Sequence, residues 1–157
     1  MEKLKYIGYS VVCEEVPDEI AVAINISGCR YRCNGCHSKY LWEYTGNYIS
    51  DDINNIIGMY DGLITCVCFM GGDQNMTELR ELLLLVKKKY GLKTCIYSGC
   101  DDFGKFNGLL NDDLIDYLKV GSYKKSLGGL DNINTNQRMY KIIGKQKTDI
   151  TYRFRRK

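Results

Sequence analysis

The stretch IAVAINIS, residues 20–27, decides the fold class. It is a short apolar run rich in β-branched residues, which is typical of a strand buried on both faces of a sheet. Comparable runs span residues 63–70, 93–98 and 114–120, and a glycine follows each of the four. Weaker strand candidates span 138–143 and 150–154. The pattern therefore predicts several buried strands, each of which ends at a turn.

Helical patterns alternate with these strands. Ser50 is expected to cap a helix in which the isoleucines of 53–57 share one face. Thr77 is expected to cap a second helix through about Tyr90, with Gly91 as its stop signal. This alternation predicts an α/β fold with a mainly parallel sheet. The chain is shorter than the roughly 200 residues of a complete eight-fold barrel. We therefore expect a small, incomplete parallel β/α barrel or an open sheet.

The composition limits the class of protein. The chain has 157 residues, a single proline and a formal net charge of +3. This length fits one domain, 1–157, with a short basic end from about residue 145. The positive excess is too small to require a nucleic-acid partner. No apolar run approaches the roughly 20 residues of a membrane span, and the first residues lack the apolar stretch of a secretory signal. We expect a cytoplasmic protein with no membrane partner.

The first strand leads into CRYRCNGC, residues 29–36. A loop this short can bring the thiolates of Cys29, Cys33 and Cys36 together, and such thiolates bind zinc or an iron–sulfur cluster. A structural zinc needs four ligands, and His37 is poorly placed to reach an ion that its neighbour Cys36 binds. Three cysteines on a [4Fe–4S] cluster leave one iron open to a substrate. The spacing favours the cluster, and a zinc knuckle completed by a distant residue is the alternative.

Two further motifs also follow predicted strands. Gly71-Gly72-Asp73 comes after residues 63–70, and Ser98-Gly99 ends the run at 93–98. Ligands bind at the carboxyl ends of parallel strands. The glycines allow a backbone to approach a ligand closely, with their amides and carbonyls available to it. Taken alone, the Gly-Gly-Asp motif indicates a tight strand-to-helix turn; the cysteine loop on a neighbouring strand favours a ligand site.

The cysteines at positions 66, 68 and 95 lie inside predicted strands. They could belong to a second metal site with Cys100, or they could be small buried hydrophobes of a sheet core. Thiols spread along strands do not converge as a loop does, so the core interpretation is favoured. Cys100 is the possible exception, because it lies just beyond its strand and beside the predicted ligand site.

The cysteine spacing after a first strand resembles that of radical S-adenosylmethionine (SAM) enzymes. The branch most similar to this chain comprises the activating proteins of anaerobic ribonucleoside-triphosphate reductase. That branch typically has Cys-Pro-Gly-Cys followed by an aromatic residue and then a tryptophan. Here Asn34 stands for the proline, His37 stands for the aromatic residue, and Trp42 follows. Further similar segments occur in the expected order from about residue 20 to 143: Gly71-Gly72-Asp73, Tyr97-Ser98-Gly99, 116–121 and Asn136-Gln137-Arg138.

This resemblance implies a fold of the radical SAM type and an oxidoreductase. Three irons of a [4Fe–4S] cluster would be held by Cys29, Cys33 and Cys36. The implied SAM-binding residues are Gly35, Cys36, His37, Gly71, Gly72, Asp73 and Ser98. A flavodoxin-like donor would supply an electron that cleaves SAM, and the resulting 5′-deoxyadenosyl radical would generate a glycyl radical on the large subunit of the reductase.

Three other interpretations remain open at this stage. The chain could be another small radical SAM enzyme or glycyl-radical activase. It could instead be a zinc-stabilised module that binds nucleic acid or protein. An electron-transfer ferredoxin would normally use a fourth cysteine ligand, and no fourth cysteine follows at ferredoxin spacing.

Overall fold

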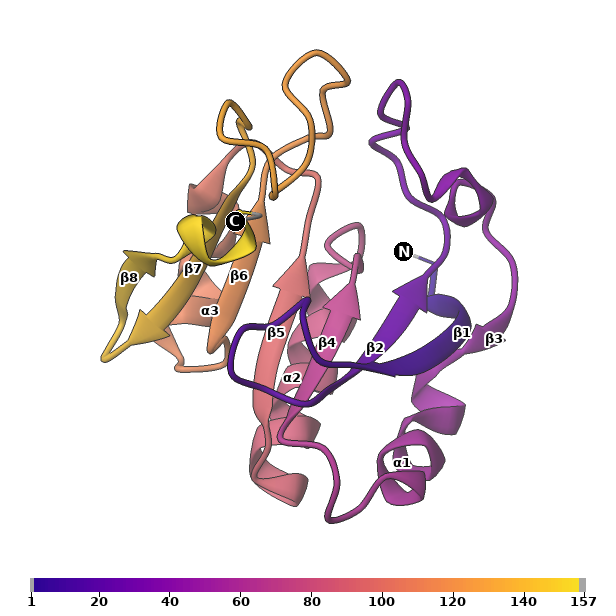
Figure 1. Ribbon diagram of the computed structural model, residues 1–157. Helices are drawn as coiled ribbons and strands as arrows, with labels where there is room; N and C mark the ends of the chain where they lie inside the picture. The colour runs from indigo at the N-terminus through magenta and orange to yellow at the C-terminus, as the bar shows by residue number, and fades with distance from the viewer. Residues whose placement is uncertain (1, 156–157) are drawn as a thin grey trace.

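The computed structural model describes residues 2–155, which form one eight-stranded sheet with three α-helices (Figure 1). The strands are β1 (Lys5–Val12), β2 (Ala21–Ile26), β3 (Asn47–Tyr48), β4 (Cys66–Met70), β5 (Lys93–Tyr97), β6 (Tyr117–Val120), β7 (Arg138–Ile143) and β8 (Gln146–Asp149). The helices are α1 (Ile49–Met59), α2 (Met76–Tyr90) and α3 (Asn107–Asn111), with short 3₁₀ turns η1 (Lys39–Leu41), η2 (Phe103–Phe106) and η3 (Thr151–Phe154).

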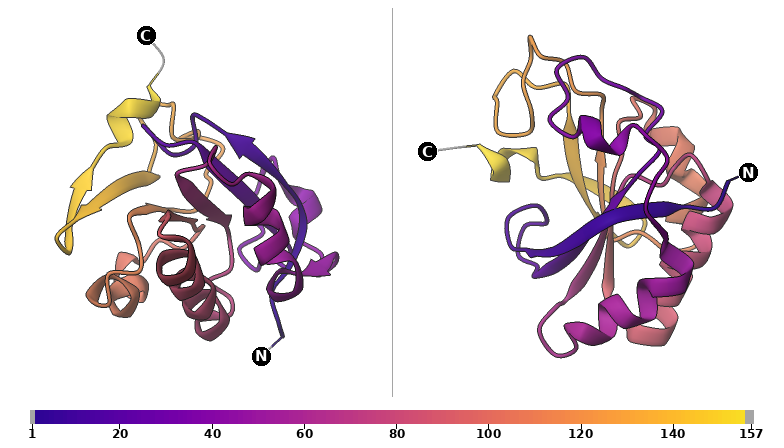
Figure 2. Two further views of the ribbon diagram at one scale, coloured as in Figure 1. Left: turned by 90° about the horizontal axis from the view of Figure 1, so that it is seen from below. Right: turned by 90° about the vertical axis from the view of Figure 1, so that its right-hand side faces the viewer.

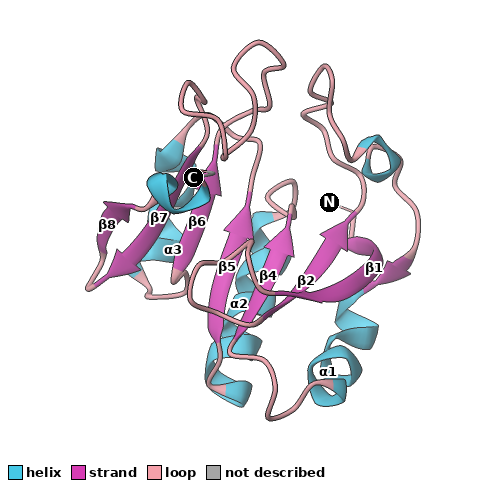
Figure 3. Ribbon diagram, in the orientation of Figure 1, coloured by secondary structure: helices cyan, strands magenta, loops and turns pink. Residues whose placement is uncertain are grey.

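The sheet is mixed and open. Its strand order is β3-β1-β2-β4-β5-β6-β7-β8, so the edge strands β3 and β8 do not pair. The central strands β2, β4, β5 and β6 are parallel, whereas the flanking strands pair antiparallel. The expected open sheet is therefore confirmed, but its parallel part is limited to the four central strands. Their carboxyl ends all lie at one edge, where the structure consists of loops (Figure 3).

The three α-helices cover one face of the sheet, as the two further views show (Figure 2). The larger core lies between these helices and the sheet. It can form there because the central strands are apolar on both faces. Its sheet side includes Ile24, Phe69 and Ile96, each fully buried, and its helix side includes Ile53 and Leu83. The parallel strands are thereby fixed in register, which fixes the positions of the loops that follow them.

A smaller core covers the opposite face. Its sheet residues include Ala23, Tyr117 and Met139, and they pack against Val16 and Ile150. Val16 comes from the segment between β1 and β2, and Ile150 precedes η3. The two peripheral segments therefore bury the second face of the central strands, which explains why those strands lack the polar alternation of a half-exposed sheet.

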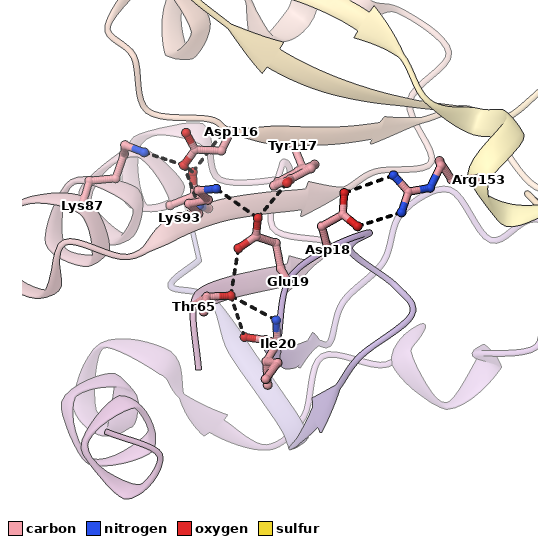
Figure 4. A network of polar contacts seen from close by, with 10 residues as sticks. Asp18, Glu19, Ile20, Thr65, Lys87, Lys93, Asp116, Tyr117 and Arg153 are labelled. Carbon is pink, nitrogen blue, oxygen red and sulfur yellow. Dashed lines mark hydrogen bonds and ion pairs between the residues drawn. The ribbon is translucent and has the colours of Figure 1, made fainter. Parts of the chain in front are cut away.

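A polar network holds the segment before β2 in place (Figure 4). The buried carboxylate of Glu19 accepts hydrogen bonds from Thr65 Oγ1 at 2.8 Å, Lys93 Nζ at 3.1 Å and Tyr117 OH at 2.8 Å. Next to it, Asp18 pairs with both terminal nitrogens of Arg153, at 2.8 and 3.1 Å. These contacts lie at the amino ends of β2, β5 and β6, opposite the loops that follow the strands.

Two predicted helix starts need correction. Helix α1 has Tyr48 at its N-cap, so Ser50 lies within the first turn. Helix α2 is capped by Asn75, whose side chain accepts the Glu78 amide at 3.1 Å, and Thr77 is already helical. Asn is as good an N-cap as Ser or Thr, so the local sequence alone does not show whether Asn75 or Thr77 caps α2. The predicted end at Gly91 is confirmed, since this residue is left-handed with φ of 63°.

Several strand predictions also need correction. The segment predicted as a strand at 150–154 is the 3₁₀ turn η3, and the last strand is instead β8. The preceding prediction at 138–143 is confirmed by β7. Strands β4 and β6 begin three residues later than predicted, and β1 and β3 were not predicted. The basic end therefore contributes β8 and η3, while residues 156–157 lie outside the described residues. Among the helices of residues 2–155, none has the length and apolar character that crossing a bilayer takes.

Candidate iron–sulfur site

The loops after the central strands enclose two neighbouring cavities. The first, here called the strand-end cavity, has a volume of about 560 Å³. The second, here called the loop cavity, has a volume of about 630 Å³. The strand-end cavity lies between the cysteine loop, residues 29–36, and the ends of β4 and β5; the loop cavity lies between the cysteine loop and residues 123–137. In Figure 1 both loop segments project beyond the same edge of the sheet.

The cysteine loop is compact because its backbone turns twice. Arg32 and Gly35 have positive φ, 45° and 78°, and Cys36 donates its amide to the Cys33 carbonyl at 3.1 Å. At its start, the Cys29 amide donates to the Leu41 carbonyl at 2.9 Å. A glycine adopts the left-handed conformation without steric cost, which explains why position 35 suits this loop.

All three cysteines of the loop are free and partly buried. The side chains of Cys29 and Cys36 line both cavities, and Cys33 lines the loop cavity. The sulfur of Cys36 accepts the Ser38 amide at 3.3 Å. Hydrogen bonds of this kind to a ligand sulfur tune the potential of iron–sulfur clusters. The structure thus brings the three predicted ligands to one cavity.

A single metal ion and an iron–sulfur cluster make different demands on the three thiols. Within residues 2–155, no group of three or more His, Cys, Asp or Glu side chains is placed to hold one metal ion. A structural zinc needs four such ligands around one centre, so the zinc-knuckle alternative finds no ligand set in the part of the chain that is described. In a cluster each cysteine binds its own iron, so the thiols can stay apart. None of the residues that line the two cavities is a fourth cysteine.

Asp73 faces the cysteine loop from the end of β4. The residue is 4% exposed, and its Oδ2 accepts hydrogen bonds from Ser98 Oγ at 2.8 Å, from Lys105 Nζ at 3.1 Å and from the Tyr31 hydroxyl. Burial and the Asp73 carboxylate raise the pKa of Tyr31, so this phenol stays protonated and donates. The cysteine loop is therefore tied to β4, β5 and η2 through one carboxylate.

Ser98 and the two glycines are already hydrogen-bonded. Ser98 Oγ donates to Asp73 and accepts the Cys100 amide at 2.9 Å. The Gly71 amide donates to the Tyr97 carbonyl at 2.9 Å, and the Gly72 amide donates to Gln74 Oε1 at 3.1 Å. The expectation that these two amides are available to a ligand is wrong in this structure. Gly71, Asp73 and Ser98 nevertheless line the strand-end cavity, whereas Gly72 packs against the core.

The remaining predicted contacts lie at the loop cavity or beside it. His37 lines this cavity, and its ring lies 5.5 Å from the Tyr123 ring in an edge-on arrangement. Gly35 lines neither cavity and packs against Tyr123 and Lys125. From the Asn-Gln-Arg motif, Gln137 reaches the loop cavity. The structure therefore brings five of the seven predicted binding residues to the two adjacent cavities, while Gly35 and Gly72 line neither.

The cysteines of the strands are core residues, as predicted. Cys66, Cys68 and Cys95 are fully buried in the smaller core. Burial raises the pKa of Cys66 and of Cys95, which keeps these thiols protonated and disfavours metal binding. Cys100 packs against the larger core and lines neither cavity, although its neighbour Gly99 lines both.

Sequence reasoning missed three residues of the site. Tyr31 and Lys105 both reach Asp73, and they come from segments 42 and 32 residues away. No local pattern indicates such contacts. Lys119 lines both cavities from β6. The sequence does carry a signal for Lys119, because a lysine inside the apolar run 117–120 is unusual for a buried strand.

Three free thiols lie around one cavity at the carboxyl ends of parallel strands, and cysteine thiolates are the groups that hold iron–sulfur clusters. The family model described as "4Fe-4S single cluster domain" matches residues 20–140, more than half of the chain. The chain therefore belongs to this family. No curated protein and no solved structure matches it significantly.

Proposed function

We propose that this iron–sulfur protein is a radical SAM enzyme that generates a glycyl radical on anaerobic ribonucleotide reductase. In this proposal Cys29, Cys33 and Cys36 hold the [4Fe–4S] cluster, and SAM binds in the strand-end cavity. A bound cluster supplies the single electron that breaks a carbon–sulfur bond of SAM and releases methionine and a 5′-deoxyadenosyl radical. That radical then removes a hydrogen atom from a glycine of the reductase.

The observation that carries the proposal is the strand-end cavity itself. It is lined by two of the three proposed ligands, Cys29 and Cys36, and also by Gly71, Asp73 and Ser98. Its volume of about 560 Å³ lies in the range of small-molecule sites, roughly 300–1,000 Å³. Its lining combines apolar side chains with a few convergent polar groups, as such sites require.

The side chains around this cavity have distinct roles in the proposal. The buried carboxylate of Asp73 is the acceptor for the amino group of the methionine moiety, which would compete with Lys105 for it. Tyr31 extends from the cysteine loop to the same carboxylate, so it helps to cover the cavity and to exclude water. Ser98 orients Asp73 through its 2.8 Å hydrogen bond. The protein thus binds, orients and shields, while the cofactor supplies the chemistry.

The loop cavity supports the choice of a macromolecular substrate. It reaches the same cysteines from the side of residues 128–132, which do not line the strand-end cavity. In the proposal, a glycine-bearing segment of the reductase enters here and completes a site that this short chain does not close alone. A flavodoxin-like protein supplies the electron, and the protein acts in the cytoplasm, where its eight free thiols stay reduced.

The test is formation of 5′-deoxyadenosine. The protein is purified without oxygen, reconstituted with iron and sulfide, and incubated with SAM and a strong reductant. We expect cluster-dependent product that disappears in Cys33→Ala. The matched control is Cys66→Ala, which removes a core thiol and is expected to keep the activity. A full iron content without product, with the reductase added as well as without it, would contradict SAM cleavage and leave an iron–sulfur protein of another function.

A further inference from the structure

Lys119 is a buried lysine beside the candidate cluster site. It is 8% exposed, and it is the only lysine among the buried residues of the described chain. Its ammonium donates to the Ser98 carbonyl at 3.2 Å and to the Gly121 carbonyl at 2.9 Å. The side chain lines both the strand-end cavity and the loop cavity. An ammonium has three donors, and these two hydrogen bonds use two of them.

Within residues 2–155, no carboxylate oxygen forms an ion pair with this ammonium. The ion pairs found there use other lysines and arginines. A buried cation without a counter-ion is costly. Burial accordingly lowers the pKa of Lys119 to about 8, and the Coulombic influence of Cys33, Asp101, Cys29 and Cys36 acts in the opposite direction. The cysteine sulfurs are therefore part of the electrostatic surroundings of Lys119.

The other cations near the cavities are placed differently. Lys105 lines the strand-end cavity, but its ammonium is paired with Asp73 at 3.1 Å. Arg30 and Arg32 belong to the cysteine loop and are exposed, so water and salt screen their charges. Only Lys119 combines burial, a position on both cavities and the lack of a carboxylate partner in the described chain. An anionic centre beside it would complete the missing ion pair.

We propose that Lys119 is the buried counter-cation of the iron–sulfur centre and that its ammonium raises the reduction potential of the cluster. A cluster bound by thiolates becomes more negative when it takes up an electron, so a nearby fixed positive charge favours the reduced form. The inference rests on the cluster of the proposed function, but not on SAM or the reductase. In this inference, Lys119 is the residue of the chain that makes the cluster easier to reduce.

The test compares the reduction potential of the reconstituted protein with that of Lys119→Met, in the absence of SAM. Methionine has a similar length but no charge. We expect the equilibrium constant for one-electron reduction to fall about tenfold, which equals 59 mV, in a titration followed by electron paramagnetic resonance. Lys119→Arg keeps the charge and is expected to keep a potential near the parent value. Lys88→Met removes an exposed lysine of α2 and is expected to change nothing.

An unchanged potential in Lys119→Met would overturn the proposal. It would leave Lys119 with a structural role only, through the Ser98 and Gly121 carbonyls. If the methionine variant takes up no iron, Lys119→Gln is titrated in its place, because glutamine is also uncharged. The result is separate from that for the proposed function, since a protein that shows the shift but makes no 5′-deoxyadenosine fails only the latter. A parent protein that takes up no cluster contradicts both.

Discussion

The charge of Lys119 also predicts how the stability of the protein changes with pH. Lys119→Met removes a buried cation that has no carboxylate partner in the described chain. The stabilities of the parent chain and of Lys119→Met are compared without added iron, so that the difference depends only on the residues of the chain. Replacing buried charged groups by apolar side chains of similar volume is often neutral or stabilising.

The magnitude follows from the pKa of Lys119, which is about 8 in the folded chain against a usual value of 10.5. A cationic group with a lowered pKa binds fewer protons in the folded state than in the unfolded state between these two values. Stability must therefore rise with pH across this window. The buried lysine costs about 3.5 kcal/mol at pH 7 and about 1.5 kcal/mol at pH 9.5. The stability of the parent chain should therefore rise by about 2 kcal/mol relative to Lys119→Met between these two pH values.

Urea unfolding at pH 7 and at pH 9.5 measures this difference. The two carbonyls that lose a donor in Lys119→Met add a cost that does not depend on pH, so the change with pH is the informative quantity. Lys88→Met, which changes an exposed lysine, is expected to track the parent chain at both pH values. A difference between parent and Lys119→Met that stays constant over this range would refute the reasoning, because it would mean that Lys119 titrates normally.

Three further predictions concern the ligands, the backbone and the polar network. Cys29→Ala should lose most of its iron after anaerobic reconstitution and Cys66→Ala should keep it, as iron per chain will measure; equal losses would contradict the assignment. Gly121→Ala should lower the unfolding free energy by about 2 kcal/mol more than Gly62→Ala. Both glycines have positive φ, but only at Gly121 would a Cβ meet backbone, at 2.9 Å; equal losses in urea unfolding would refute this. Glu19→Ala leaves three donors without their carboxylate and should cost about 3 kcal/mol, and a loss below 1 kcal/mol in the same assay would contradict the network.

The strands that the sequence predicts most clearly are those that helices or peripheral segments cover on both faces. Residues 21–26 and 66–70 are almost entirely buried, so they read as continuous apolar runs. Strand β1 is half-buried, and its register shifts between Tyr6 and Tyr9, around Gly8. That irregularity removes the two-residue period by which a half-buried strand is recognised. Strand β8 is exposed throughout, so its pairing with β7 leaves no hydrophobic signal in the sequence.

The residues of the candidate site also differ in how well the sequence predicts them. Its three cysteines lie within one loop, so their spacing alone indicates a shared ligand. The contact between Tyr31 and Asp73 depends on the parallel pairing of β2 with β4, which positions two loops 42 residues apart. The availability of the Gly71 and Gly72 amides could not be predicted either, because their partners are fixed by the turn that follows β4.

The central claim is a [4Fe–4S] cluster that three cysteines hold and that leaves one iron open to SAM. Electron paramagnetic resonance of the reduced, reconstituted protein, recorded with and without SAM, tests this claim most directly. We predict a [4Fe–4S] signal that changes when SAM is added and that is lost in Cys33→Ala. A signal that SAM leaves unchanged, or a colourless protein that holds zinc after anaerobic reconstitution, would contradict the account.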